Sequence, residues 1–93
     1  MPQIFKVGSI WVYFWANEGK PVEPIHVHAA KGRPRENGTK IWITENGKCL
    51  VASHNDSDIS VGELKTLLRV IEANSDEIIE KWIEFFGEIR YFC

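Results

Sequence analysis

The chain has 93 residues, 44% of them hydrophobic and 26% charged, and its formal net charge at pH 7 is −2. A chain of this length makes one domain, residues 1–93, and it needs a dense apolar core because a short chain buries a small share of its surface. No apolar stretch approaches the roughly 20 residues of a membrane span, and no secretory signal opens the sequence. Two cysteines are too few for a disulfide scaffold, so we expect reduced thiols, a cytoplasmic location and no membrane partner.

Charge divides the chain into two halves of opposite sign. Residues 1–52 carry seven Lys and Arg against four Glu, a net charge of +3, whereas residues 53–93 carry four against nine carboxylates, a net charge of −5. The acidic second half argues against a nucleic-acid-binding protein.

Two β-rich runs, Ile4–Val7 and Ile10–Trp15, are joined by Gly8-Ser9, and such a loop predicts a hairpin. The second run is apolar on both faces. One of these faces presents aromatic side chains: Trp11, Tyr13 and Trp15. Because the helices can cover only the other face, this face needs a loop or a partner as its cover.

Ile25–Ala29 alternates apolar and polar residues, which predicts a third strand, and Lys31–Gly38 is typical of a loop. A second hairpin follows, because Lys40–Thr44 and Lys48–Ala52 flank Asn46-Gly47.

A two-residue turn in this hairpin would place Glu45 opposite Lys48, an ion pair that helps to set the register. The same register predicts one apolar face made of four residues: Ile41, Ile43, Leu50 and Ala52. The opposite face would then carry Trp42, Thr44, Cys49 and Val51.

Ser60-Val61-Gly62-Glu63 is a capping box, which predicts the start of a helix. Its apolar stripe consists of Val61, Leu64, Leu67, Leu68 and Ile71. The helix should end near Asn74, which tolerates a left-handed conformation, and Ser75 should cap a second helix. The buried face of that second helix consists of Ile78, Ile79, Trp82, Phe85, Phe86 and Ile89. After Gly87, the tail Tyr91-Phe92-Cys93 either folds back or contacts another chain.

These elements predict an α+β fold, an antiparallel sheet of four to five strands packed on a C-terminal αα-hairpin. Residues 1–52 form mainly β hairpins, and residues 60–90 form the two helices.

Glu23-Pro24-Ile25-His26-Val27-His28 is the segment best suited to chemistry. Two His two residues apart on a strand project from one face, with Cα atoms roughly 6.5–7 Å apart. They could bind a divalent transition metal with Glu23 as third ligand, or act with Glu23 as catalytic acid and base. Spacing alone favours a structural role for them, with hydrogen bonds to loop backbone or stacking on Trp11, Trp15 or Trp42. Further candidates follow the second hairpin: His54, Asp56 and Asp58.

A basic group suggests contact with nucleic acid: Lys31, Arg33, Arg35 and Lys40. The last helix would be repelled by a phosphate backbone. It carries four carboxylates: Glu77, Glu80, Glu84 and Glu88. No G-x-S-x-G, G-x-G-x-x-G or P-loop pattern occurs, which argues against nucleophilic catalysis and against a nucleotide cofactor. Whether the chain is an enzyme stays open, and the hypotheses below lean toward a role without catalysis.

Several short motifs occur in order along the chain: Met1-Pro2, Asn17-Glu18-Gly19, Glu23–His28, Lys40-Ile41-Trp42, Glu63-Leu64 and Trp82–Gly87. With them, the chain resembles a small bacterial family marked by an E-P-x-H-V-H motif, domain of unknown function 4160. The resemblance implies little chemistry. It does imply genes that often lie beside a gene for another small uncharacterised protein, in pairs that resemble toxin–antitoxin modules.

Three hypotheses follow. The first is an interaction or regulatory protein, one member of a toxin–antitoxin-like module, which binds the protein of an adjacent gene through Trp11, Tyr13, Trp15, His26 and His28. The second is a metal-dependent hydrolase or nuclease that uses His26 and His28 with Glu23. The third is a protein that contacts nucleic acid through the Lys31–Arg35 loop. A homo-oligomer is compatible with each of them.

Overall fold

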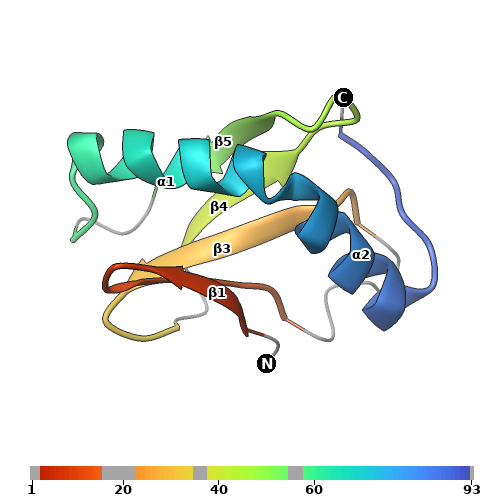
Figure 1. Cartoon of the computed structure of the whole chain (residues 1–93), viewed down its shortest axis with the longest axis horizontal. Helices are drawn as coiled ribbons and strands as arrows, with labels where there is room; N and C mark the ends of the chain where they lie inside the picture. Colours follow the sequence, from red (N-terminus) through yellow and green to blue (C-terminus); the bar gives the residue numbers. More distant parts are fainter. Residues whose placement is uncertain (1–2, 16–22, 35–37, 55–57, 93) are drawn as a thin grey trace.

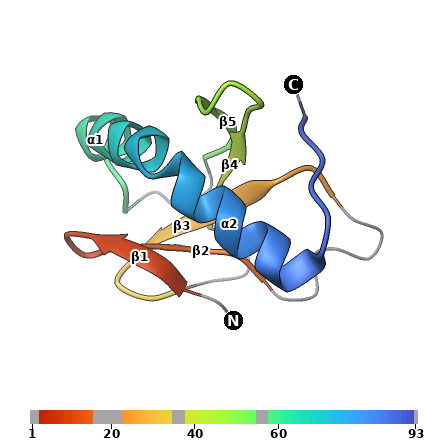
Figure 2. The same ribbon diagram turned by 45° about the vertical axis from the view of Figure 1, so that its right-hand side comes forward.

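The computed structural model describes residues 3–15, 23–34, 38–54 and 58–92. Over these residues, seven elements follow one another: β1 (Gln3–Val7), β2 (Ile10–Tyr13), β3 (His26–Lys31), β4 (Thr39–Ile43), β5 (Cys49–Ser53), α1 (Val61–Ala73) and α2 (Ser75–Phe86). The strands form one antiparallel sheet in chain order, β1 to β5. Both helices lie on the same side of this sheet (Figures 1 and 2). The predicted α+β fold is confirmed.

The start of α1 is set by the capping box that the sequence predicted. The Ser60 hydroxyl accepts a hydrogen bond from the Glu63 amide at 3.1 Å, and the Glu63 carboxylate accepts one from the Ser60 amide at 3.0 Å. The junction with α2 differs from the prediction. Asn74 has a φ of −113° and Ser75 is already helical, so neither the left-handed Asn74 nor a Ser75 cap occurs.

The β4–β5 hairpin has a three-residue loop, Glu45–Gly47, where a two-residue turn was predicted. The Thr44 amide donates to the Lys48 carbonyl at 2.9 Å, and Gly47 takes a φ of +78°. This geometry is typical of a three-residue hairpin whose glycine closes the loop. The predicted pairing of Glu45 with Lys48 is therefore wrong.

The longer loop shifts the register of β5 by one residue. Ile43 pairs with Cys49 and Ile41 pairs with Val51, so Cys49 and Val51 share the face of the two isoleucines. The prediction that Leu50 lies on that face is wrong, because a shift of one residue turns every side chain of a strand to the other side.

The core lies between the sheet and the helices. The strands contribute the alternating residues of the helix-facing side, and the helices contribute Leu67, Ile71, Ile78 and Trp82, all fully buried. Two residues predicted to be buried are not: Val61 is 69% exposed and Phe85 is 53% exposed. Each lies in a terminal turn of its helix, Val61 in the first turn of α1 and Phe85 in the last turn of α2.

The described part of the C-terminal tail, up to Phe92, folds back on the domain, and Cys93 lies outside the described residues. Gly87 ends α2 with a φ of +76°, and its amide donates to the Ile83 carbonyl at 2.7 Å. The chain then returns past the segment before β3, where the Arg90 carbonyl accepts a hydrogen bond from the Ile25 amide at 2.8 Å. The Phe92 ring stacks on Trp42 with centroids 4.8 Å apart.

No helix in the described part of the chain has both the length and the apolar character to cross a membrane.

Candidate functional site

The two histidines of β3 lie side by side, as their spacing predicted. The ring centroids of His26 and His28 are 5.1 Å apart, with their planes nearly perpendicular. Both side chains are buried: His26 has no exposed surface and His28 is 7% exposed. Aromatic rings surround them, since Tyr13 stacks on His28 at 5.7 Å and Trp42 meets the edge of His26 at 5.7 Å. The imidazoles therefore belong to an aromatic cluster.

Local backbone geometry orients the His26 ring. Its Nδ1 lies 3.0 Å from the Pro24 carbonyl oxygen, and because a carbonyl only accepts, Nδ1 carries the proton. Nε2 then faces the Glu23 carboxylate at 4.0 Å, too far for a hydrogen bond. Among residues 3–15, 23–34, 38–54 and 58–92, no three His, Cys, Asp or Glu side chains are grouped so that they could hold a metal ion.

The predicted partner-binding residues are mostly packed within the chain. Tyr13 is fully buried, and its hydroxyl lies so close to Gly38 that a Cβ there would be 2.6 Å away. Trp15 is half-buried, with its ring 5.5 Å from that of Tyr13. Trp11 is half-buried too: its indole N–H donates to the Gly32 carbonyl at 2.9 Å. Of the five predicted residues, only the two tryptophans retain substantial exposed surface.

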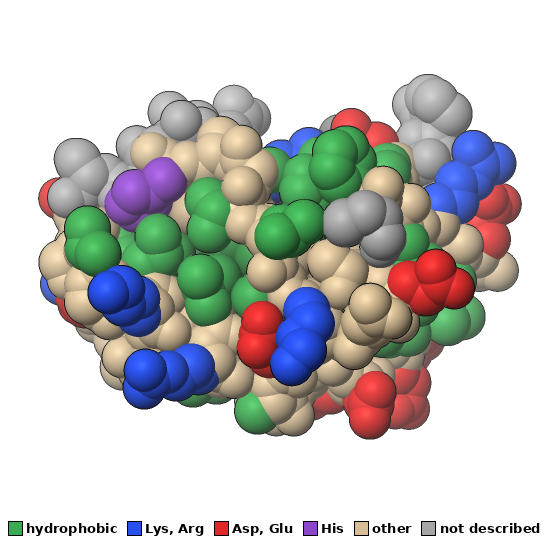
Figure 3. All heavy atoms as spheres, turned by 90° about the horizontal axis from the view of Figure 1, so that it is seen from above, with side chains coloured by type: hydrophobic (Ala, Val, Ile, Leu, Met, Phe, Trp, Pro, Cys, Tyr) green, Lys and Arg blue, Asp and Glu red, His purple; other side chains and the backbone are tan. Residues whose placement is uncertain are grey.

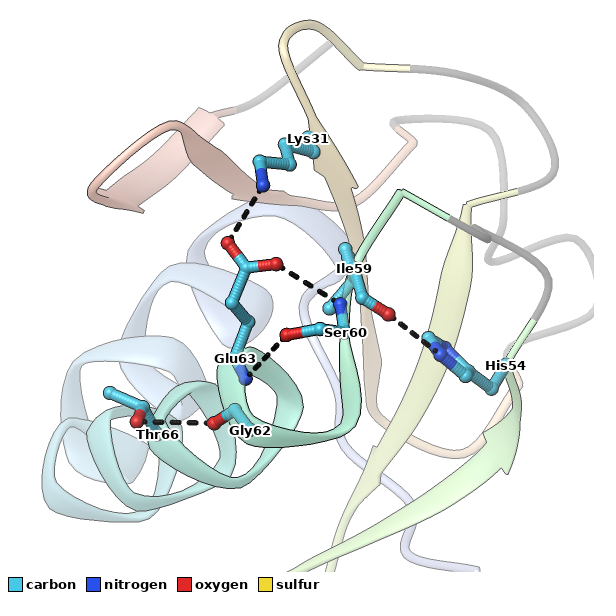
Figure 4. Close-up of polar contacts among 7 residues, drawn as sticks. All are labelled: Lys31, His54, Ile59, Ser60, Gly62, Glu63 and Thr66. Atoms are coloured by element: carbon cyan, nitrogen blue, oxygen red, sulfur yellow. Dashed lines mark hydrogen bonds and ion pairs between the residues drawn. The ribbon is translucent and has the colours of Figure 1, made fainter.

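Two of the four predicted basic residues, Lys31 and Lys40, contact other side chains of the domain. Lys31 is the last residue of β3, and its Nζ lies 2.8 Å from Glu63 Oε2 of α1 (Figure 4). The Nζ of Lys40 lies 4.4 Å above the ring of Trp42. Arg33 is exposed, and Arg35 lies outside the described residues.

Glu63 therefore has two partners, the Lys31 ammonium and the Ser60 amide (Figure 4). These hydrogen bonds, with Lys31 contributing most, lower the pKa of Glu63 from 4.5 to about 2. The ion pair joins the end of β3 to the first turn of α1.

His54 stabilises the connection between β5 and α1. Its Nε2 donates to the Ile59 carbonyl at 3.2 Å (Figure 4), and its Nδ1 lies 2.9 Å from the Thr39 hydroxyl. Of the two carboxylates proposed to accompany it, Asp58 is exposed and Asp56 lies outside the described residues.

Sequence reasoning missed a surface where α1 meets β5, the edge strand. We call this surface the α1–β5 flank; it consists of Val51, Val61, Leu64 and Leu68. Val51 is 39% exposed and Val61 is 69% exposed, while Leu64 and Leu68 are half-buried. Figure 3 shows hydrophobic side chains gathered on this side of the molecule, with Lys and Arg at their border. The sequence did not predict this surface, because the predicted two-residue turn placed the Val51 side chain on the face of the sheet away from α1.

Glu72 of α1 joins the helix to this edge of the sheet. Its Oε1 accepts a hydrogen bond from the Cys49 amide at 3.3 Å and lies 3.7 Å from the Cys49 thiol. Burial, with the nearby Glu72 charge adding to it, raises the pKa of Cys49 to about 12. The thiol is therefore protonated and unreactive at neutral pH.

A shallow depression of about 420 Å³ lies between the β1–β2 turn and the start of α1. Its walls are Val7, Gly8, Ser9, Ile10, Gly62, Glu63 and Thr66.

Comparison with known proteins places most of the chain in one group. The family model described as a domain of unknown function, DUF4160, matches residues 9–83. No curated protein and no solved structure matches the chain.

Proposed function

We propose that this chain, which belongs to the DUF4160 family of domains of unknown function, acts by binding a partner protein. The partner is the product of an adjacent gene, and the two form a toxin–antitoxin-like pair. The observation that carries the proposal is the apolar α1–β5 flank, where Val51 and Val61 are exposed among the described residues.

Single exposed apolar residues are ordinary on a protein surface, but grouped ones indicate an interaction site. Val51 belongs to β5 and Val61 to α1, two elements in contact. Leu64 and Leu68, which are half-buried, lie on the same side of α1 as Val61 by their helical spacing. Burial of such side chains contributes roughly 25 cal/mol per Å² of apolar area. A partner that covered the flank would gain this free energy without any rearrangement of the core.

The binding surface proposed here differs from the one predicted from sequence. Tyr13 and His26 have no exposed surface and His28 has 7%, so a partner could reach them only if the chain rearranged. Val51 and Val61 of the flank are exposed in the folded domain. The flank is therefore a better binding surface than the residues predicted from sequence.

Co-expression of this chain with the protein of the neighbouring gene, followed by size-exclusion chromatography, tests the proposal. We expect the two proteins to elute together. Val51→Lys should separate them, because it places a charge on the flank. Ile83→Lys is the matched control, since Ile83 is apolar, 42% exposed and on α2, and it should leave the complex intact. Two separate peaks for the unmodified pair would count against the proposal.

A metal-dependent hydrolase or nuclease is the second candidate. One observation favours it: the adjacent imidazoles of His26 and His28, which could supply two ligands. Because the described residues hold no group of three such ligands, this candidate requires a further ligand from outside them. Metal analysis of untagged protein, with His28→Ala and His54→Ala compared, tests it. A stoichiometric transition metal lost only in His28→Ala would support this candidate, and metal-free protein would argue against it.

A further inference from the structure

The C-terminal tail contacts the sheet as a bound peptide would. Beyond α2, residues 88–92 form neither helix nor strand, and Figures 1 and 2 show them running back toward β4 and β5. The Arg90 carbonyl accepts a hydrogen bond from the Ile25 amide at 2.8 Å. The Phe92 ring stacks on Trp42 with centroids 4.8 Å apart and planes 4° from parallel. A backbone hydrogen bond and a side-chain contact are the two kinds of contact with which a sheet holds an extended peptide.

The backbone bond of the tail uses a donor at the end of the β3–β4 pairing. The pairing begins with His26 and Trp42, and one residue earlier the Ile25 carbonyl accepts a hydrogen bond from the Ile43 amide at 3.1 Å. A complete antiparallel pair of this kind exchanges two such bonds, whereas the Ile25 amide donates to Arg90. The tail therefore takes a backbone position that β4 leaves open.

Trp42 directs its ring to the face of the sheet that the helices do not cover. Its neighbours Ile41 and Ile43 belong to the core beneath the helices, and alternation along a strand turns Trp42 to the opposite face. There the ring is half-buried and meets the edge of the buried His26 ring. We call the Ile25 amide together with the Trp42 ring the tail site. It provides one hydrogen-bond donor and one flat apolar surface.

The tail is less buried than the elements it contacts. Phe92 is 58% exposed although it stacks on Trp42, and Ile89 and Tyr91 are only half-buried at the border of the core. Terminal segments with few buried contacts open at a lower free energy than the core does. The tail can therefore leave its site while the sheet stays folded. The family model, which matches residues 9–83, includes the tail site and stops before the tail.

We propose that the tail site binds peptides, that the C-terminal tail occupies it in the free protein, and that an extended segment of another protein displaces the tail. The incoming segment would accept the Ile25 N–H with a backbone carbonyl and stack an aromatic side chain, two residues further on, on Trp42. This is the spacing of Arg90 and Phe92. Because the Lys40 ammonium lies 4.4 Å from the centre of the Trp42 ring, a neutral aromatic side chain fits there better than a second cation. The inference goes beyond the proposed function, since the Trp42 ring and the α1–β5 flank lie on opposite faces of the sheet.

A peptide with the sequence of the tail tests the site in the full-length protein. The probe is a blocked peptide of residues 88–92, added to ¹⁵N-labelled protein that carries Phe92→Ala and followed by NMR. We expect shifts of the Ile25 amide and of the Trp42 indole N–H. The unmodified protein should bind the peptide roughly fivefold more weakly, because its own tail competes with an intact aromatic pair. A peptide with Ala in place of its Phe should lose a similar factor on the Phe92→Ala protein.

Phe85→Ala is the matched control for Phe92→Ala. Phe85 is 53% exposed, and its ring contacts Phe14 and Phe86, so its removal should leave the peptide affinity of the unmodified protein unchanged. Trp42→Leu, made in the Phe92→Ala protein, removes the stacking surface but keeps an apolar side chain, and it should weaken binding at least fivefold. If Phe92→Ala fails to fold, Phe92→Leu provides the same comparison.

Hydrogen exchange measures the opening of the tail directly. In the unmodified protein the Ile25 amide is bonded to the Arg90 carbonyl, so its exchange requires the tail to leave. Phe92→Ala should speed this exchange roughly fivefold, because it removes the aromatic pair. The amide of Ile71, inside α1, should exchange at the same rate in both proteins, and added peptide should slow the exchange at Ile25 again.

Three results would overturn the proposal. They are the absence of any shift in the Phe92→Ala protein at millimolar peptide, equal peptide affinities of the Phe92→Ala and Phe85→Ala proteins, and an Ile25 amide that exchanges as slowly as that of Ile71 in every variant. Self-association of the free protein that protects Ile25 would also overturn it, because the occupant would then be the tail of a second copy. The co-elution experiment does not depend on any of these outcomes, so the proposed function is tested separately.

Discussion

The Glu63 side chain forms two stabilising contacts, one within the first turn of α1 and one with the end of β3. It completes the capping box of α1 through the Ser60 amide and pairs with Lys31 at the end of β3. Local sequence predicted the first role. The second depends on the sheet and the helix coming together, since the two residues are 32 positions apart.

We expect the stability that Glu63 contributes to depend on pH. Its pKa is lowered from 4.5 in the unfolded chain to about 2 in the folded protein, so the contribution is complete above pH 4.5 and is lost as pH falls through about 2. Urea unfolding of the protein and of Glu63→Gln at several pH values measures this contribution. The difference between them should shrink between pH 4.5 and 2, and a difference that stayed constant would contradict the assignment.

The histidines show the limit of arguments from residue spacing. Their common face on β3 followed from the alternation of a strand. Their burial did not, because it depends on Tyr13 and Trp42 from the two neighbouring strands and on Trp82 of α2. A shared face is therefore weak evidence for an accessible site.

At the scale of elements, the β4–β5 hairpin determines which surface is available. Gly47 allows a three-residue loop because it can adopt a positive φ. That loop turns Cys49 and Val51 toward α1 and creates the flank. The conformation of Gly47 thus determines that Val51 lies on the α1–β5 flank, the surface proposed to bind a partner.

Gly47→Ala should destabilise the domain by about 1–2 kcal/mol, the usual cost of a left-handed conformation for a residue with a Cβ. Gly62→Ala is the matched control, because Gly62 lies in α1 and a Cβ there would meet nothing within 4 Å. It should instead stabilise the domain by up to about 1 kcal/mol. Thermal unfolding of both variants checks the prediction, and equal losses would argue against a strained loop.

For the whole molecule, one apolar cluster joins every layer of the domain. It includes residues of the sheet and of both helices, together with Ile59, which lies in the connection between β5 and α1. Trp82 lies at its centre, with its ring 5.3 Å from Phe14 and 4.4 Å from Phe86. Phe85 touches the same Phe14 but remains 53% exposed.

Trp82→Ala should therefore cost about 3–5 kcal/mol, because it leaves a cavity in a closed core. Phe85→Ala should cost about 1 kcal/mol, because it removes one aromatic contact at the surface. Denaturant titration followed by circular dichroism gives both values. A similar cost for the two substitutions would mean that α2 packs differently on the sheet.

Local sequence patterns were enough to predict the order and approximate ends of the strands and helices, the capping box at Ser60 and most of the core. These features depend on hydrogen bonds and side-chain periodicity within a few residues. Four features became evident only in the folded molecule: the register of β5, the burial of His26, the path of the tail and the pairing of Lys31 with Glu63. Each of these depends on which distant segments meet, and local patterns carry no information about such contacts. The tail site belongs to this second group, since Ile25, Trp42 and the tail meet only once the domain has folded.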